Sequence, residues 1–218
     1  MKHLSFAFFT IALLIACNTA DNKTDDAKED DSKIASEGKP TAKEWVPVDS
    51  ATAMRTMMEV ATPGPQHTLL AKSNGEWVGE TTMWMAPDAP PVKATSTAVN
   101  KMIMGGRYQQ TTFKGNFMGQ PFEGTSITGY DNAKKLFTNT WIDNMSTGTM
   151  YMEGPWDEAT KTMTLKGRMI NPANGIECEM REVYKLIDDN TQIMEMYGPD
   201  MKTGKEYKNM EIKFTRKK

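Results

Sequence analysis

Cysteine and histidine are scarce in this sequence, which contains two residues of each type among 218. Apart from Cys17 the only cysteine is Cys178, so we expect no disulfide within the folded part of the chain. Apart from His3 the only histidine is His67, whereas zinc enzymes usually need several histidines and a Ser-His-Asp triad needs an imidazole held by a carboxylate. We therefore expect no metal site and no cofactor, and we assign no catalytic residue.

An excess of one charge is also missing. The chain has 26 basic and 28 acidic residues, which gives a formal net charge of -2. Basic residues do not alternate with aromatic residues in any patch, as they do in many nucleic-acid-binding domains. The sequence therefore predicts no nucleic-acid partner.

Long hydrophobic runs are absent except at the N-terminus, where an apolar segment follows Lys2. Residues 4–16 are too few to span a bilayer and have the layout of a secretory signal, so we expect a signal peptide over residues 1–16. The segment ends in "LIAC", which resembles the bacterial lipobox, and this resemblance implies lipidation of Cys17. Three acyl chains on Cys17 would anchor the protein firmly to a membrane.

The residue after Cys17 and the segment that follows suggest where the protein resides. Asn18 is not the aspartate that resembles an inner-membrane retention signal, which favours the outer membrane of a Gram-negative envelope, facing the periplasm or the cell surface. Residues 17–44 are polar, with almost no apolar residue and many charges of both signs, so we expect a disordered acidic linker. Its acidic cluster also resembles some surface-export signals, although a solvated linker is the simpler interpretation.

Residues 45–218 are expected to form one domain that begins with helical segments and continues as strands. "DSATAMRTMMEVA" has the N-cap candidates Asp49 and Ser50 and methionines at helical spacing, and it lies within a helical lead-in over residues 49–74. From Trp77 onward, runs rich in Thr, Val, Met and aromatic residues alternate with turn residues. We predict strands at 76–86, 92–104, 106–118, 121–131, 134–143, 148–157, 161–170, 177–187, 191–198 and 207–216.

Short turns between these strands favour an antiparallel up-and-down order. About ten strands in that order are best closed into a barrel, because an open sheet leaves edges that promote aggregation. The sequence therefore predicts an all-β fold, a single antiparallel β-barrel of about ten strands, with the helical segment before Trp77 covering one end.

Several motifs in fixed order resemble a known family. They are a lead-in of His67, Leu69 and Leu70 before "GEWVGETTMW", then "MGGRY", "PFEGTSITGYD", "WIDNMSTG" and "NMEIKFTR". Together they resemble the bacterial family called domain of unknown function 1579 (DUF1579) over residues of about 65–216. The resemblance implies a barrel similar to calycins and lipocalins, and it implies no activity because the family has none established.

The strand predicted at 134–143 carries the first candidate site residues. Phe137, Asn139, Trp141 and Asp143 share one face of that strand, and the opposite face is also mixed. A barrel with a partly polar interior is more often a binding cavity than a filled core. Tyr130 ends the preceding strand, and we include it with Trp141 and Asp143 among the candidate ligand contacts.

Arg107 and Glu182 complete the candidate site. Arg107 follows two glycines that allow a sharp bend, and an inward arginine would need a carboxylate from Asp143, Glu123 or Glu182. A satisfied ion pair is the simpler interpretation, whereas an arginine with free donors inside a cavity would hold an anionic head group.

Methionine is frequent and recurs in the motifs "MWM", "MIM", "MYM" and "MEM". Each motif places two thioethers on one side of a strand, and thioethers are suitable ligands for Cu(I). Methionine is also a flexible filler of adaptable cavities, and here it occurs equally in segments with no such pairs. We expect these side chains to line a cavity rather than bind copper.

These observations support three functional hypotheses. The first is a lipid-anchored binding module that holds a small, largely apolar ligand with an acidic or hydroxyl head. The second is a barrel enzyme that uses Asp143 or Glu182 as a base and Tyr130 as a proton donor. The third is a structural or interaction protein of the outer membrane whose barrel is filled.

Overall fold

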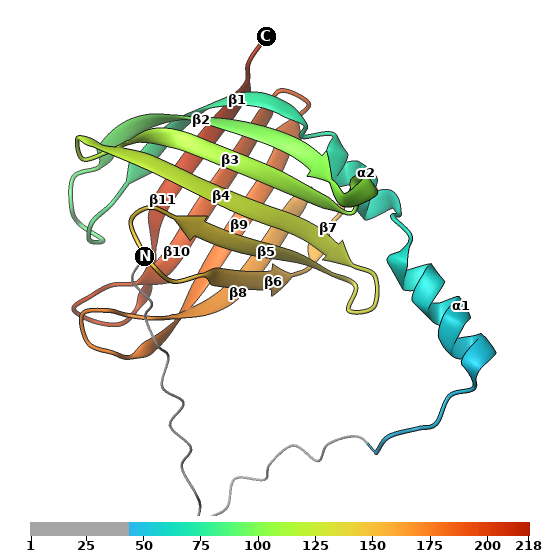
Figure 1. Ribbon diagram of the computed structural model, residues 1–218. Coiled ribbons are helices and arrows are strands. Elements are labelled where there is room, and N and C mark those ends of the chain that lie inside the picture. The colour runs from blue at the N-terminus through green and yellow to red at the C-terminus, as the bar shows by residue number, and fades with distance from the viewer. Residues whose placement is uncertain (1–43) are drawn as a thin grey trace, which may run out of the picture. The chain divides into compact units, whose positions relative to one another are not determined.

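The computed structural model describes residues 44–218, and residues 47–218 form one compact unit (Figure 1). The signal peptide predicted at 1–16, Cys17 and the predicted linker up to residue 43 lie outside the described residues. Within the described part, no helix is both long enough and apolar enough to cross a membrane.

The compact unit is an antiparallel β-barrel in which each strand pairs with its neighbour in the sequence (Figure 1). Strand β1 also pairs with β11, and β6 pairs with β8, so ten strands form a closed ring. This arrangement confirms the predicted all-β, up-and-down barrel of about ten strands. The strands are β1 (Gly75–Met83), β2 (Val92–Ile103), β3 (Tyr108–Phe117), β4 (Gln120–Asp131), β5 (Leu136–Asp143), β6 (Met150–Gly154), β7 (Trp156–Asp157), β8 (Thr162–Ile170), β9 (Glu177–Asp188), β10 (Thr191–Pro199) and β11 (Glu206–Arg216).

The single strand predicted at 148–157 is instead two strands. β6 ends at Gly154 and the two-residue β7 begins at Trp156, with Pro155 between them. Proline has no backbone N–H to donate, so it interrupts the hydrogen-bond ladder. At the same point the chain approaches β8 so closely that a Cβ on Gly154 would lie 1.9 Å from the carbonyl oxygen of Thr164. β6 therefore closes the ring and β7 extends one side of β8.

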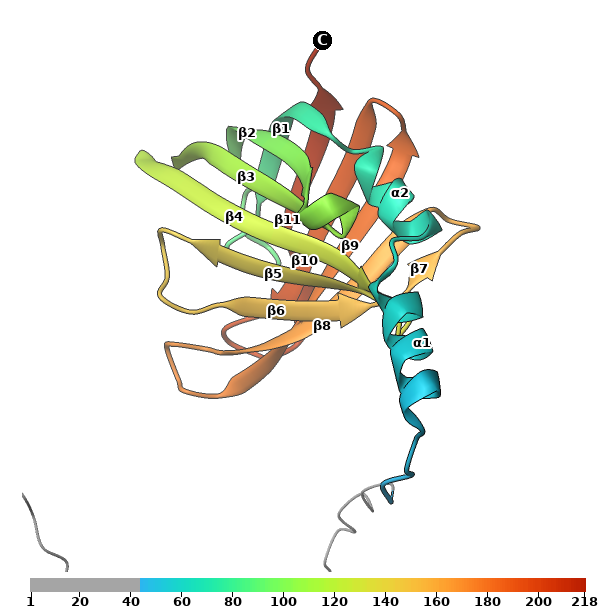
Figure 2. The same cartoon turned by 45° about the vertical axis from the view of Figure 1, so that its right-hand side comes forward.

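Two helices precede the barrel, α1 (Ser50–Ala61) and α2 (Pro65–Ala71), with a 3-10 turn, η1 (Met104–Gly106), between β2 and β3. The Asp49 carboxylate caps α1 by accepting the N–H groups of Ala51 and Thr52, as the sequence predicts. α2 lies against one end of the barrel and buries His67 and Leu70. α1 buries no side chain, and Figure 2 shows it continuing outward beyond α2. Only α2 therefore covers the barrel end.

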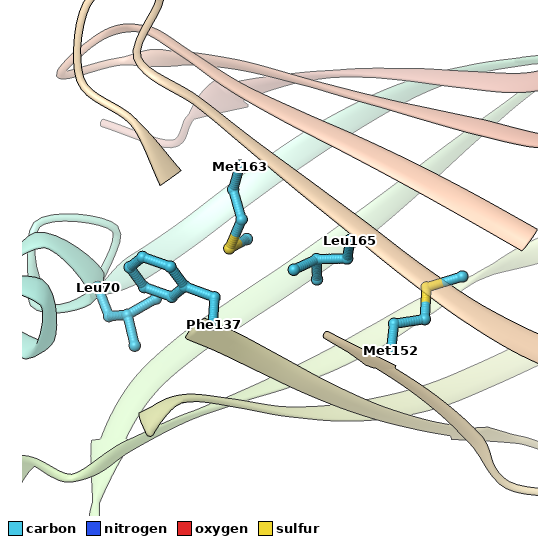
Figure 3. Close-up of a cluster of buried hydrophobic side chains, with 5 residues drawn as sticks. All are labelled: Leu70, Phe137, Met152, Met163 and Leu165. Atoms are coloured by element: carbon cyan, nitrogen blue, oxygen red, sulfur yellow. The ribbon is translucent and has the colours of Figure 1, made fainter. Parts of the chain in front are cut away.

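An apolar cluster packs α2 onto the barrel. It consists of Leu70 from α2 with Phe137, Met152, Met163 and Leu165 from β5, β6 and β8 (Figure 3). Leu165 and Phe137 are almost fully buried. A second cluster, formed by Trp77, Ala98, Ile212 and Phe214, lies on the wall made by β1, β2 and β11. The two apolar clusters are separate, one at the α2 end and one along a single wall. They therefore do not fill the interior of the barrel.

Candidate ligand-binding cavity

The barrel encloses a cavity of about 1380 Å³, and all ten strands of the ring contribute to its lining. This volume exceeds the range of roughly 300–1,000 Å³ that is usual for small-molecule sites. α2 closes one end through Leu69, Leu70 and Ser73, whereas loop residues 144–149 and Pro172 line the opposite end. Arg168 also lines that opposite end, and because its side chain is 69% exposed we identify this end as the entrance.

The closed end is fixed by a hydrogen-bond network around Ser73, just after α2. The Ser73 carbonyl oxygen accepts the indole N–H of Trp77 at 2.8 Å and the amide of Asn100 at 2.9 Å. The Ser73 hydroxyl accepts the Gln192 amide at 2.8 Å, and the Gln192 carbonyl accepts the Tyr184 hydroxyl. Ser73, just after α2, therefore ties α2 to three strands, β1, β2 and β10.

The cavity has two chemically different walls. Neighbouring strands β2 to β5 supply a polar wall in which Asn100 pairs with Thr111, Thr111 with Ser126, and Thr128 with Asn139. All of these residues line the cavity, and none of them is charged. Strands β6, β8, β10 and β11 supply an apolar wall rich in methionine, namely Met150, Met152, Met163, Met169, Met194, Met196 and Met210. The interior therefore suits a molecule with both a polar and an apolar part.

Three buried polar atoms on this lining have no hydrogen-bond partner among residues 44–218. They are the Ser96 hydroxyl oxygen and the side-chain carbonyl oxygens of Asn100 and Asn139. A buried polar group without a partner is costly, and most such groups in folded proteins are satisfied. All three atoms can accept a hydrogen bond, so they mark positions where a ligand could donate one.

Glu182 is the buried carboxyl group of the cavity. It lies on β9 opposite Leu165 of β8 and Met196 of β10, and only 8% of its surface is exposed. Within the described part of the chain it makes no hydrogen bond and no ion pair. Burial raises the pKa of Glu182 to about 7. The pKa of the neighbouring Tyr184 hydroxyl is raised as well, first by burial and then by the Glu182 charge.

Trp141 and Asp143 form a fixed pair near the entrance. The Trp141 indole N–H donates to one Asp143 oxygen at 2.7 Å, while the other oxygen accepts the backbone N–H groups of Met145 and Ser146. The indole ring lies over Gly124, where an added Cβ would come within 2.4 Å of two ring carbons. Phe113 and Phe122 flank the same ring, with centroids 5.2 and 6.2 Å away. Trp141 thus presents a rigid aromatic surface to the cavity.

Arg107 does not point into the barrel, and the expectation that it does is wrong. Its side chain is exposed, with Nε donating to the Ala61 carbonyl at 3.0 Å and a terminal nitrogen to the Met104 carbonyl at 3.2 Å. No ion pair links it to a carboxylate among residues 44–218. The reason is local: Gly105 and Gly106 have φ of 66° and 82°, which turns the chain and takes Arg107 out of the strand. Arg107 instead holds the C-terminal end of α1.

Tyr130 also lies outside the cavity lining. Its ring packs edge-on against Phe137 and His67, at centroid distances of 5.0 and 6.1 Å, in the cluster beneath α2. The pKa of His67 is lowered, mainly because it is buried there. Of the five candidate ligand contacts, the structure brings Trp141, Asp143 and Glu182 to one cavity and places Arg107 and Tyr130 elsewhere. The acid–base arrangement with Tyr130 as proton donor is therefore not assembled.

Sequence reasoning missed most of the polar wall, although a signal for it exists. Side chains alternate between the two faces of a strand, so the inward positions can be found by counting in steps of two from an apolar residue such as Ala98. The residues found at inward positions in this way include Asn100, Thr111 and Ser126. Sequence analysis recognised this mixture of polar and apolar residues only in the strand that contains residues 137–143. All four members of its mixed face, Phe137, Asn139, Trp141 and Asp143, line the cavity. Sequence spacing places them on one face of the strand but does not decide that this face points inward.

The paired methionines divide between cavity and surface. Both members of two pairs, Met150 with Met152 and Met194 with Met196, line the cavity. Met85 and Met104 are 60% and 69% exposed. Among residues 44–218 there is no group of three or more His, Cys, Asp or Glu residues that could hold a metal ion. That the cavity methionines do not bind copper stays a prediction.

Comparison with known proteins supports the fold and leaves the activity open. A family model described as "Protein of unknown function (DUF1579)" matches residues 62–216. No curated protein matches the sequence. Among solved structures, the crystal structure of Rv2717c from M. tuberculosis is similar, with a TM-score of 0.54 and 14% sequence identity, covering 72% of this chain and 100% of that one. At this identity the similarity concerns the fold alone.

Proposed function

The chain belongs to the DUF1579 family of proteins of unknown function, and we propose that its barrel is a binding module for a small, largely apolar molecule with a polar group. The observation that carries this proposal is the cavity of about 1380 Å³ with unpartnered acceptors on one wall and methionines on the other. A ligand that donates to those acceptors and covers the methionines would satisfy both walls. Each Å² of apolar surface buried in this way contributes about 25 cal/mol.

We further propose that Cys17 carries the lipid anchor and that the barrel acts at the outer membrane of a Gram-negative envelope. The apolar segment at 4–16 and the "LIAC" motif support this location. A barrel tethered beside a membrane is well placed to exchange apolar molecules with it. The enzyme hypothesis has less support, because both Asp143 oxygens already accept structural hydrogen bonds and Tyr130 is outside the cavity.

A neutral apolar dye tests the binding function. N-phenylnaphthylamine should bind the purified protein with increased fluorescence, because the cavity removes the dye from water. The variant Ser96→Phe places a ring inside the cavity and should weaken dye binding by about tenfold, which corresponds to about 1.4 kcal/mol.

The control is Thr97→Phe, which adds the same ring at the next position, on the exposed outer face of β2. This variant should bind the dye as the unmodified protein does. Equal affinity for Ser96→Phe and the unmodified protein would show that the dye binds outside the barrel, and the proposed function would be abandoned.

A further inference from the structure

We propose that Glu182 forms the polar subsite of the cavity and that it selects ligands whose head group donates hydrogen bonds, alcohols or amines, over ligands with an acidic head. This inference rests on the proposed binding function and deepens it by naming the head-group chemistry. Its basis is the position of one buried carboxyl group without a partner among residues 44–218, on the strand between the methionine-bearing strands β8 and β10.

Glu182 has apolar neighbours on both adjacent strands and no hydrogen-bond partner among residues 44–218. Its neighbours across the sheet are Leu165 and Met196, and Met194 and Met210 line the same region of the cavity. Two residues along the same strand, on the same face, Tyr184 also lines the cavity, and its hydroxyl already donates to Gln192. Glu182 is more than nine-tenths buried and has no partner in the described part of the chain. A carboxyl group in this position gains most from a ligand that donates a hydrogen bond to it.

Few charged side chains line the cavity, and those other than Glu182 lie at the entrance. Among residues 44–218, only four ionisable side chains line the cavity: Asp143, Arg168, Glu182 and Tyr184. Asp143 accepts three hydrogen bonds at the entrance, and Arg168 is exposed there and pairs with Glu177. No lysine, histidine or arginine lies deeper among the described lining residues. An acidic head group inside the cavity would therefore face Glu182 with no cation to compensate either charge.

Both protonation states of Glu182 are compatible with a ligand that donates a hydrogen bond. Burial raises its pKa to about 7, so both states are populated near neutral pH. The ionised carboxylate can pair with an ammonium group, and either state can accept a hydrogen bond from a hydroxyl. Both classes of donor ligand are thus compatible with the site, whereas a carboxylate ligand is compatible only when one of the two acids is protonated.

Displacement of bound N-phenylnaphthylamine by dodecanol, dodecylamine and dodecanoate provides the test, since the three share one alkyl chain and differ in the head group. For the unmodified protein we expect the alcohol and the amine to displace the dye at concentrations about tenfold lower than dodecanoate. In Glu182→Leu this preference should become several-fold smaller, while dye binding itself persists, because the contribution of Glu182 is lost and only the cost of burying the ligand carboxylate remains. Glu182→Gln should keep the preference for the alcohol and lose the preference for the amine, because an amide accepts a hydrogen bond but carries no charge.

The matched control is Glu179→Gln on the outer face of the same strand, where the carboxylate pairs with Lys166 at 2.9 Å in solvent. It should leave the ligand order unchanged. Equal or tighter binding of dodecanoate to the unmodified protein would overturn the inference, as would an unchanged preference in Glu182→Leu. Failure of the dye itself to bind would instead overturn the proposed function, so the two failures are distinguishable.

Discussion

Glu182 is the residue at which burial and charge oppose each other most strongly in this cavity. In the unfolded chain its pKa is expected near the ordinary value of 4.5, and in the folded protein burial raises it to about 7. Between these two values the unfolded state binds fewer protons than the folded state. The free energy of unfolding therefore falls as the pH rises from about 4.5 to about 7, and the loss is complete above that range.

The substitution Glu182→Gln should abolish this loss of stability with rising pH, because glutamine does not titrate and has nearly the same volume as glutamate. The unmodified protein loses stability as the pH rises and the variant does not. The free energy of unfolding of the variant minus that of the unmodified protein should therefore be about 3 kcal/mol larger at pH 8 than at about pH 4.5. Urea denaturation at both pH values measures the change, with Glu179→Gln as the exposed control. If the stabilities of Glu182→Gln and the unmodified protein differ by the same amount at both pH values, Glu182 is not buried as described.

Gly124 provides a second prediction at the residue scale. A Cβ at this position would collide with Trp141, so Gly124→Ala should destabilise the barrel by about 1–3 kcal/mol through overpacking. Gly148→Ala is the control, because nothing lies within 4 Å of a Cβ there. In a Trp141→Phe background the smaller ring should relieve most of the cost. Additive effects of the two substitutions in urea denaturation would show that the ring does not lie over Gly124.

Among the secondary-structure elements, α1 is attached to the barrel chiefly through its C-terminal carbonyl groups. Arg107 donates to the Ala61 carbonyl, and the Asn132 amide donates to the carbonyls of Val60 and Thr62 at 3.0 and 2.8 Å. The last carbonyls of a helix have no partner within the helix, so these side chains satisfy groups that would otherwise be left to water. No side chain of α1 is buried, and Met57 and Met58 are 62% and 65% exposed.

The double variant Arg107→Ala, Asn132→Ala should therefore release α1 without unfolding the barrel. We expect faster proteolytic cleavage within residues 50–62 and a nearly unchanged melting temperature of the barrel. Arg55→Ala, on the exposed surface of α1 itself, is the control. A large fall in the melting temperature with no change in cleavage would mean that these residues support the barrel instead.

The strands were predictable because period-two alternation and turn residues act locally. Predicted and observed bounds agree closely for β4, at 121–131 and Gln120–Asp131, and for β11, at 207–216 and Glu206–Arg216. The residue pattern at 148–157 predicts one strand, whereas the structure breaks that strand at Pro155, which has no N–H to donate. The orientation of Arg107 depends on two glycines with positive φ, and alternation within a strand cannot be counted across such a turn.

The candidate site was predictable only in part, for a reason of geometry. Trp141 and Asp143 share a strand, so their common face follows from sequence spacing alone. The approach of Glu182 to the same cavity depends on how ten strands close into a ring, and the volume left inside depends on the size of side chains from all of them. Neither quantity can be read from a single segment.

For the whole molecule, the lipid anchor that we propose at Cys17 would determine where the barrel acts. The variant Cys17→Ser cannot receive a thioether-linked lipid, so we expect the protein to move from membrane fractions to soluble fractions of the host. Cys178→Ser is the control, since Cys178 lies on β9 in the barrel and should not affect membrane attachment. Continued sedimentation of Cys17→Ser with membranes would show that something other than Cys17 anchors the protein.

The central claim is that the barrel holds a small apolar molecule, and native mass spectrometry tests it most directly. The protein should be purified from its own host under non-denaturing conditions and measured before and after addition of dodecanol. We predict a discrete mass increase in at least one of the two samples, lost on denaturation and reduced in Ser96→Phe. A spectrum showing only the mass of the denatured protein, both before and after addition of dodecanol, would contradict the account.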